Sequence, residues 1–249
     1  MMKPIRLVLA AALALAAAPL ARAAEVPVAV AANFTEPAKE IAAAFKKATG
    51  NEASLSFGSS GQFYTQITRG APYQVFLSAD VERAQKAEQD GVGVPGTRFV
   101  YATGKLVLYS KTPGLADAGE AALKGGRFQK LAIADPAAAP YGAAAVQTLQ
   151  KLGVYAAVKP RIVQGSSITQ AYQFVETGAA ELGFVALSQV IDKPGGSRWF
   201  VPEALHTPID QGAILLWTGD KNPAARAFLK FLRGPEATAI IRRYGYTVK

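Results

Sequence analysis

Short apolar segments alternate with amphipathic segments along most of the chain. The apolar runs have the length and composition of strands, and most precede a segment whose apolar residues recur every three to four positions, as in a helix. The predicted strands are residues 26–31, 53–57, 74–78, 105–110, 131–134, 161–164, 182–187 and 213–217. The predicted helices are residues 36–49, 59–69, 81–89, 143–153, 167–177, 223–232 and 235–244. Repeated strand–helix units predict an α/β protein with parallel sheets that helices cover on both faces.

Several polar residues stand where helices are expected to begin. Thr35 is placed to cap the first helix with its hydroxyl. Ser59 and Gln62 have the spacing of a capping box, and so do Ser167 and Gln170. These signals predict that each polar turn after a strand opens directly into a helix.

The strand–helix units form two blocks, between which the chain is predicted to pass near residues 102–104 and again near residues 206–212. We therefore expect an α/β protein of two lobes, each a mostly parallel sheet flanked by helices. Residues 24–102 and 212–249 form the first lobe in this interpretation, and residues 103–211 form the second.

The first 23 residues have the features of a secretory signal peptide. Lys3 and Arg6 precede an apolar run from Leu7 to Leu20, and the segment ends in Ala21-Arg22-Ala23, a small-x-small cleavage pattern. The apolar run is about 14 residues long, shorter than the roughly 20 that span a bilayer. We expect cleavage near Ala23 or Ala24 and export to the periplasm.

Composition narrows the class of protein further. The chain has no cysteine, so an exported form has no disulfide and depends on its apolar core. The formal net charge is +9, of which three positive charges belong to the predicted signal peptide. The basic pairs Lys46-Lys47 and Arg242-Arg243 are short and separate, which is typical of a solvated surface rather than of a nucleic-acid interface.

Four strand-to-helix junctions share one character: each is small or polar, and none contains a charged residue. The junctions are residues 31–33, 58–61, 139–142 and 165–168. Ligands of open parallel sheets bind outside the carboxyl ends of the strands, which is where these junctions are expected to lie. The first turn of a helix offers unpaired N–H groups and a partial positive charge, so several converging junctions could hold a small oxyanion on uncharged donors. A purely structural role for each turn as a helix cap remains the alternative.

The residues that most enzymes and metal sites require are scarce. There is no G-x-S-x-G motif, and His206 is the only histidine. It lies away from the four junctions, where it is expected on the surface or at a hinge. Without cysteine or a D-x-D-x-D-G loop, the sequence offers no metal-ligand cluster. A binding protein is therefore favoured over an enzyme.

The motifs of the junctions and their order resemble those of the periplasmic molybdate-binding proteins of ABC importers. The similar segments are VAVAANFTEPAKEIAAAF, FGSSGQFYTQITRGAPYQVFLSAD, ATGKLVLYS, GSSITQAYQFVETGAAELGFV and KFLRGPEATAIIRRYGY. They cover nearly all of the chain after the predicted signal peptide. The resemblance implies a type II periplasmic-binding-protein fold that closes over molybdate or tungstate.

The resemblance also implies which residues hold the oxyanion, through hydrogen bonds rather than by coordinating the metal. Asn33 takes the position of a serine or asparagine donor, and Ser60 offers its hydroxyl and N–H. Tyr141 and Ile168 would donate their backbone N–H groups. Some members add a tyrosine hydroxyl where this chain has Ala186, so we expect the side-chain amide of Asn33 to replace that donor.

The resemblance further implies a monomeric receptor without a cofactor, which docks on an inner-membrane ABC permease. Two other ligands remain possible at this point. Sulfate is a smaller tetrahedral dianion that the same donors would suit. Ferric iron would need a tyrosine pair, which Tyr244 and Tyr246 could offer, although this segment is also typical of a helix end.

Overall fold

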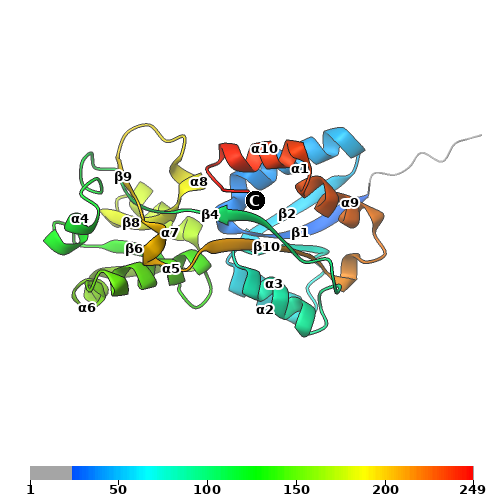
Figure 1. Cartoon of the computed structure of the whole chain (residues 1–249), viewed down its shortest axis with the longest axis horizontal. Coiled ribbons are helices and arrows are strands. Elements are labelled where there is room, and N and C mark those ends of the chain that lie inside the picture. Colours follow the sequence, from blue (N-terminus) through cyan, green and yellow to red (C-terminus); the bar gives the residue numbers. More distant parts are fainter. Residues whose placement is uncertain (1–23, 249) are drawn as a thin grey trace, which may run out of the picture.

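The computed structural model describes residues 24–248, so the predicted signal peptide lies outside the described residues. The chain forms two five-stranded sheets, one in each half of an elongated molecule (Figure 1). The first sheet has the strand order β2-β1-β3-β10-β4. Its strands are β1 (Glu25–Ala31), β2 (Glu52–Gly58), β3 (Val75–Leu77), β4 (Phe99–Gly104) and β10 (Ile209–Leu215). Strands β1, β2 and β3 are parallel, and β10 runs antiparallel to β3 and β4.

The second sheet repeats this plan with the order β7-β6-β8-β5-β9. Its strands are β5 (Leu106–Ser110), β6 (Leu131–Ala134), β7 (Ile162–Gly165), β8 (Leu182–Ala186) and β9 (Ser197–Phe200). Strands β6, β7 and β8 are parallel, whereas β5 is antiparallel to both β8 and β9. The two-lobe α/β fold is confirmed, with mixed sheets.

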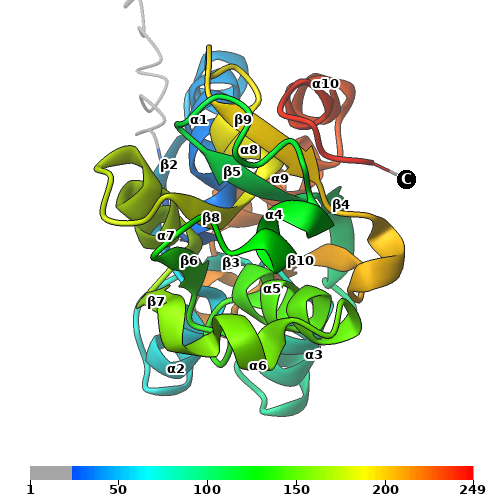
Figure 2. The ribbon, with the colours of Figure 1, turned by 90° about the vertical axis from the view of Figure 1, so that its left-hand side faces the viewer.

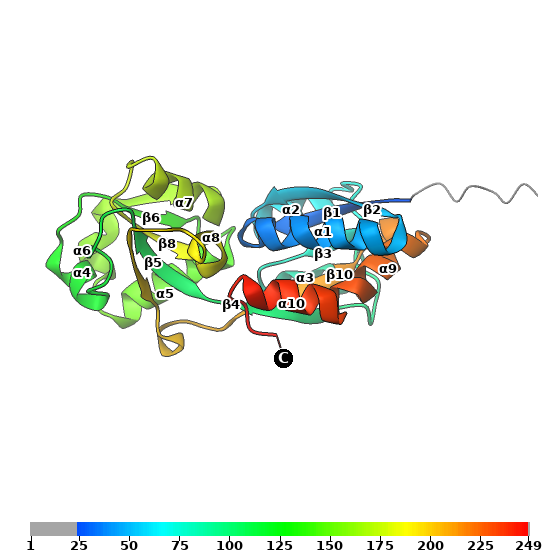
Figure 3. The same ribbon diagram turned by 90° about the horizontal axis from the view of Figure 1, so that it is seen from above.

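Alternating side chains on the strands of the first lobe give its sheet two apolar faces. Val28 and Val30 of β1 face a cluster that includes Phe45, whereas Ala29 faces the cluster around Phe76. The first face carries α1 (Thr35–Thr49), α9 (Pro223–Leu232) and α10 (Pro235–Arg243), and the second carries α2 (Ser60–Thr68) and α3 (Val81–Gln89) (Figure 3). The C-terminal helices thus complete the core of the first lobe.

The second lobe packs around one larger core. Helices α5 (Pro140–Lys151) and α7 (Ile168–Glu176) cover opposite faces of its sheet, as the view from above shows (Figure 3). The remaining helices are α4 (Glu120–Gly125), α6 (Tyr155–Val158) and α8 (Leu187–Val190), which lie around these two (Figure 2). The core continues across the lobe boundary, because Ala31, Ala32 and Ala79 of the first lobe belong to the same buried cluster.

The chain passes between the sheets twice. The outward passage is Lys105, between β4 and β5, and the return lies between β9 and β10. The C-terminal Thr247 pairs with Thr103 of β4 through two backbone hydrogen bonds of 2.8 and 3.0 Å, so the tail is fixed beside the outward passage. The predicted lobe boundaries at 102/103 and 211/212 stay a prediction. The chain changes from one sheet to the other at Lys105 and between β9 and β10.

Two of the expected helix caps are wrong. Thr35 is the first residue of α1, and its hydroxyl donates to the carbonyl of Ala32 over 2.8 Å, because Ala32–Phe34 form a 3₁₀ turn that begins the helical path earlier. Ser59 is the N-cap residue of α2, but its hydroxyl makes no capping bond. Ser167 does cap α7, accepting from the N–H of Gln170 over 3.3 Å.

Candidate functional site

The four uncharged junctions follow β1, β2, β6 and β7, and hydrogen bonds between the lobes bring them together. Thr169, beside Ile168, donates its hydroxyl to the carbonyl of Ala32 over 3.3 Å, which joins the first junction to the fourth. The N–H of Gly61 donates to the carbonyl of Ala138 over 2.9 Å, which joins the second junction to the third. Both bonds run between the lobes, so all four junctions lie at the interface between them.

The second junction contains two buried serines with different surroundings. Ser60 accepts a hydrogen bond from the N–H of Ala79 over 2.9 Å, so its own proton is free to be donated. Ser59 is 3% exposed, and its hydroxyl is buried with no hydrogen-bond partner within residues 24–248. A buried polar atom without a partner is costly, so each one in a native structure needs an explanation, of which a bound ligand is one. Ser59 is thus a candidate donor that the sequence alone presented as an ordinary cap.

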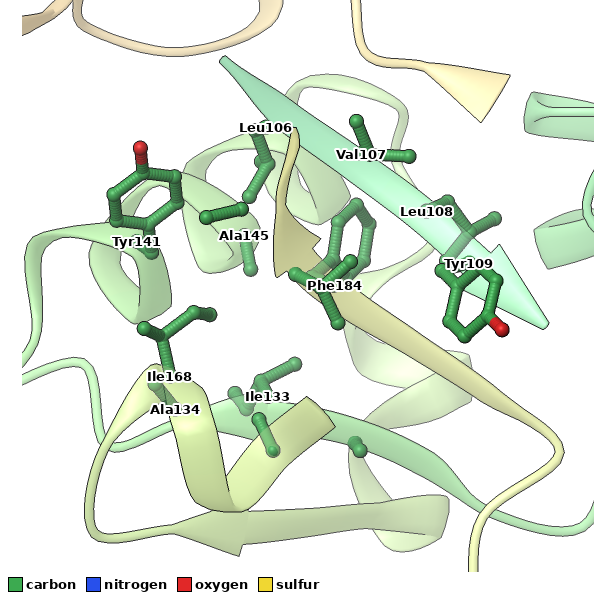
Figure 4. Packing of buried hydrophobic residues seen from close by; sticks show 14 of the residues in the cluster. Leu106, Val107, Leu108, Tyr109, Ile133, Ala134, Tyr141, Ala145, Ile168 and Phe184 are labelled. Atoms are coloured by element: carbon green, nitrogen blue, oxygen red, sulfur yellow. The ribbon is translucent and has the colours of Figure 1, made fainter. Parts of the chain in front are cut away.

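The third junction presents the start of α5. Pro140 is its first residue, and Tyr141 follows with an N–H that has no partner within the helix, because of its position in the first turn. The Tyr141 side chain is buried in the second-lobe core (Figure 4), and its hydroxyl accepts from Gln211 over 3.4 Å. Gly142 is required here, since a Cβ atom would overlap the carbonyl of Ala134. Tyr141 can therefore serve a ligand through its backbone.

The fourth junction is arranged in the same way. Ser167 accepts from Gln170 N–H, and the Gln170 side chain in turn accepts from the N–H of Ser166 over 2.6 Å. The N–H of Ile168, the first residue of α7, remains without a helical partner. Its side chain points into the core beside Ala134 (Figure 4). Ile168 too can act only through its backbone.

The first junction differs from the expectation in one respect. The side-chain amide of Asn33 donates to the side-chain oxygen of Gln211 over 2.9 Å and to the hydroxyl of Tyr246 over 3.0 Å. Both amide protons are thus used within the protein. The donor that Asn33 can offer to a ligand is its backbone N–H in the first turn of Ala32–Phe34.

Two charged residues, Arg83 and Asp80, lie beside the second and third junctions. Arg83 donates to the carbonyl of Ala137 in the other lobe over 2.8 Å and forms an ion pair with Asp80. Asp80 also accepts from the hydroxyl of Ser78 over 2.9 Å. Arg83 therefore contacts the loop before the third junction while its charge is balanced within its own lobe.

The tyrosines behind the site are neutral. Burial raises the pKa of Tyr101 and of Tyr141 well above the usual value, and it raises the pKa of Tyr246 to about 12. Tyr101 donates its hydroxyl to Gln211 over 2.9 Å, so the same glutamine links Asn33, Tyr101 and Tyr141. The site is consequently surrounded by neutral hydrogen-bonding groups.

The described residues give little support to a cation site. Residues 24–248 contain no group of three His, Asp or Glu side chains that could hold a metal ion. The hydroxyl of Tyr246 is turned inward, where it donates to the carbonyl of Asn33 over 2.8 Å. His206, expected on the surface or at a hinge, is only 5% exposed, so the surface position is wrong. It lies in the return passage between the lobes, and the hinge position stays a prediction.

The fold consists of two mixed α/β lobes that two passages join, and uncharged helix starts lie between the lobes. This arrangement is typical of the class of receptors that enclose a small solute. Residues 26–247 match the family described as bacterial extracellular solute-binding protein, and the chain belongs to that family. It is 57% identical over 229 residues to "Molybdate-binding protein ModA" of Rhodobacter capsulatus, an alignment that covers 92% of this chain and 90% of the relative.

Solved structures agree with this placement. The periplasmic molybdate-binding protein of Azotobacter vinelandii superposes with a TM-score of 0.87 at 42% identity, covering 90% of this chain and 99% of that structure. The sulfate-binding protein SubI of Mycobacterium tuberculosis, at 13% identity and a TM-score of 0.75, shares the fold alone. The resemblance inferred from the sequence motifs is thus confirmed. In residues 24–248, no helix has both the length and the apolar character needed to cross a membrane.

Proposed function

We propose that this chain is a periplasmic receptor that binds molybdate between its two lobes and delivers it to an inner-membrane ABC permease. The observation that carries the proposal is that four uncharged helix starts lie at the interface between the lobes, and that one of them contains a buried serine hydroxyl without a partner among residues 24–248. The relatives named above as molybdate-binding support the choice of ligand. In this function the protein acts as a monomer, needs no cofactor and breaks no bond.

The donor set explains why a fully deprotonated oxyanion would be preferred. We assign the ligand donors as the N–H groups of Asn33, Ser60, Tyr141 and Ile168, together with the hydroxyls of Ser59 and Ser60. A dianion such as molybdate only accepts hydrogen bonds, so a set of donors satisfies it. Protonated phosphate would also need an acceptor; the N–H groups supply none, and only the two serine hydroxyls could accept, each by turning its own proton away from the ligand. Tungstate has the same charge and shape and is expected to bind as well.

Calorimetry of the purified chain from Ala24 onward tests the proposal. Titration with molybdate should give a 1:1 isotherm, titration with tungstate a similar one, and titration with sulfate or phosphate a much weaker signal. Tighter binding of sulfate than of molybdate would identify the other tetrahedral dianion as the ligand. If none of the four anions binds or raises the melting temperature, the proposed function is wrong.

A further inference from the structure

Helix α8 of the second lobe reaches the first lobe behind the ligand site. Ser188, which is 7% exposed, donates its hydroxyl to the carbonyl of Asn33 over 2.8 Å. Ser188 lies two positions after Ala186, the last residue of β8. Here the hydroxyl supplied by this part of the second lobe contacts protein backbone of the first lobe.

The C-terminal segment of the first lobe completes this contact. The hydroxyl of Tyr246 lies 2.8 Å from the carbonyl of Asn33 and 3.0 Å from the hydroxyl of Ser188. The same hydroxyl accepts from the side-chain amide of Asn33 over 3.0 Å, and its ring packs edge-on against Phe34 at 5.4 Å between centroids. Ser188 therefore meets a partner that is already fixed in place.

Packing brings the same elements together independently of these polar contacts. Gly245 has a φ of +83°, and a Cβ atom there would lie 2.6 Å from the side chain of Leu187 and 3.0 Å from that of Ile191. The turn before Tyr246 can thus approach α8 closely because it has no side chain. The contact between α8 and the C-terminal turn joins the lobes through protein atoms only.

We propose that Ser188 is a positioning residue that holds the turn Ala32–Phe34 against the second lobe and so slows release of the oxyanion. Its bond spans the two lobes and breaks when they separate, whereas the bonds of Asn33 to Gln211 and Tyr246 lie within the first lobe. Part of the closed state is therefore stabilised without ligand. The proposal rests on the proposed function for the ligand, but its effect on lobe separation does not depend on which solute binds.

Two measurements test the proposal in the chain from Ala24 onward. Since the sequence has no cysteine, spin labels can be placed on cysteines introduced at the exposed positions Arg69 in the first lobe and Gln173 in the second. Distances between the labels, with and without molybdate, report the separation of the lobes. Stopped-flow displacement of molybdate by tungstate reports release.

Ser188→Ala should shift the ligand-free distances toward larger separation and speed molybdate release about threefold to tenfold, as expected for one lost hydrogen bond. Ser188→Thr, which keeps the hydroxyl, should restore both values. Tyr246→Phe removes the hydroxyl that contacts Ser188 and both polar groups of Asn33, and it should act in the same direction. Its effect should not add fully to that of Ser188→Ala, because both contact the Asn33 carbonyl.

Ser110→Ala is the matched control. Ser110 is a buried serine whose hydroxyl donates to the carbonyl of Glu181 over 2.6 Å within the second lobe. Its removal should lower the melting temperature and leave lobe separation and release unchanged. The proposal is overturned if Ser188→Ala and Tyr246→Phe both match the parent in distances and release. If molybdate does not bind the parent, the proposed function fails, and the ligand-free distances still decide the role of Ser188.

Discussion

Ser59 provides a test in which stability and binding should move in opposite directions. Its hydroxyl is buried without a partner, whereas the neighbouring hydroxyl of Ser60 accepts from Ala79. An unsatisfied buried polar group costs about 1–3 kcal/mol. Ser59→Ala removes that cost from the ligand-free protein, so the free energy of unfolding should stay the same or rise by about 1 kcal/mol.

The same change should weaken ligand binding. A hydrogen bond to a charged acceptor contributes about 1.5–3 kcal/mol, which corresponds to a dissociation constant for molybdate about 10- to 150-fold higher in Ser59→Ala. Ser60→Ala should instead reduce both stability and affinity. It leaves the N–H of Ala79 without its acceptor, and it removes a hydroxyl that we assign as a ligand donor. Urea unfolding of the ligand-free protein and calorimetry with molybdate measure the two effects separately.

Comparison of the two variants gives a clear refutation. If Ser59→Ala loses stability to the same extent as Ser60→Ala, its hydroxyl has a structural partner, and the inference from its burial is wrong. If Ser59→Ala binds molybdate as tightly as the parent, the hydroxyl is no ligand donor. Ser197→Ala, which removes a buried hydroxyl that donates to Thr112 far from the site, should reduce stability alone.

Three further predictions concern closure, pH and salt. Gly104→Ala should weaken molybdate binding at least about tenfold, which is equivalent to 1.4 kcal/mol. The reason is that a Cβ atom at this position overlaps the hydroxyl of Tyr141 when the lobes are together. Gly125→Ala is the control and should bind like the parent, because no atom lies within 4 Å of its Cβ position. The free energy of unfolding, measured as a function of pH, should be constant from about pH 7 to 10 and fall as pH rises from 10 toward 12. The raised pKa of Tyr246 favours its neutral form in the folded state, so this contribution is lost as the hydroxyl ionises. A decline already at neutral pH would contradict this. The dissociation constant for molybdate, measured by calorimetry, should change less than about threefold between roughly 50 and 500 mM NaCl. The reason is that the proposed donors are neutral and the nearby Arg83 is ion-paired with Asp80. A steep salt dependence would indicate a basic site.

The sequence predicts the two-lobe fold well because each strand–helix unit has a local signature. The sequence does not predict strand β4, because Phe99–Gly104 lie next to the apolar run of β5 and periodicity shows no boundary between them. The antiparallel direction of β5 and β10 depends on how the chain passes between the lobes, and no local pattern encodes that passage. Ser197–Phe200 is a short edge strand with little apolar alternation.

The candidate site is predictable as a set of turns but not as a set of atoms. Ile168 has no chemical signal, since only its backbone is available, and its role was inferred from resemblance alone. Ser59 looks like a cap in sequence, and only its unpartnered hydroxyl distinguishes it. Gln211 and Tyr246 have their roles because they contact Asn33, from which they are separated by 178 and 213 positions in the sequence. No short-range pattern can show such contacts.

The arrangement suggests how an uncharged site can hold a dianion firmly and still release it. In the proposed function each donor contributes modestly and the donors come from both lobes, so opening by a hinge motion would remove several bonds together. Contacts such as that of Ser188 with Asn33 add to closure without touching the ligand. Closure and binding are therefore coupled, because a ligand shifts the lobes only by its preference for the closed state. A partner that separates the lobes would lower affinity without competing for any donor, which is the property that delivery to a permease requires.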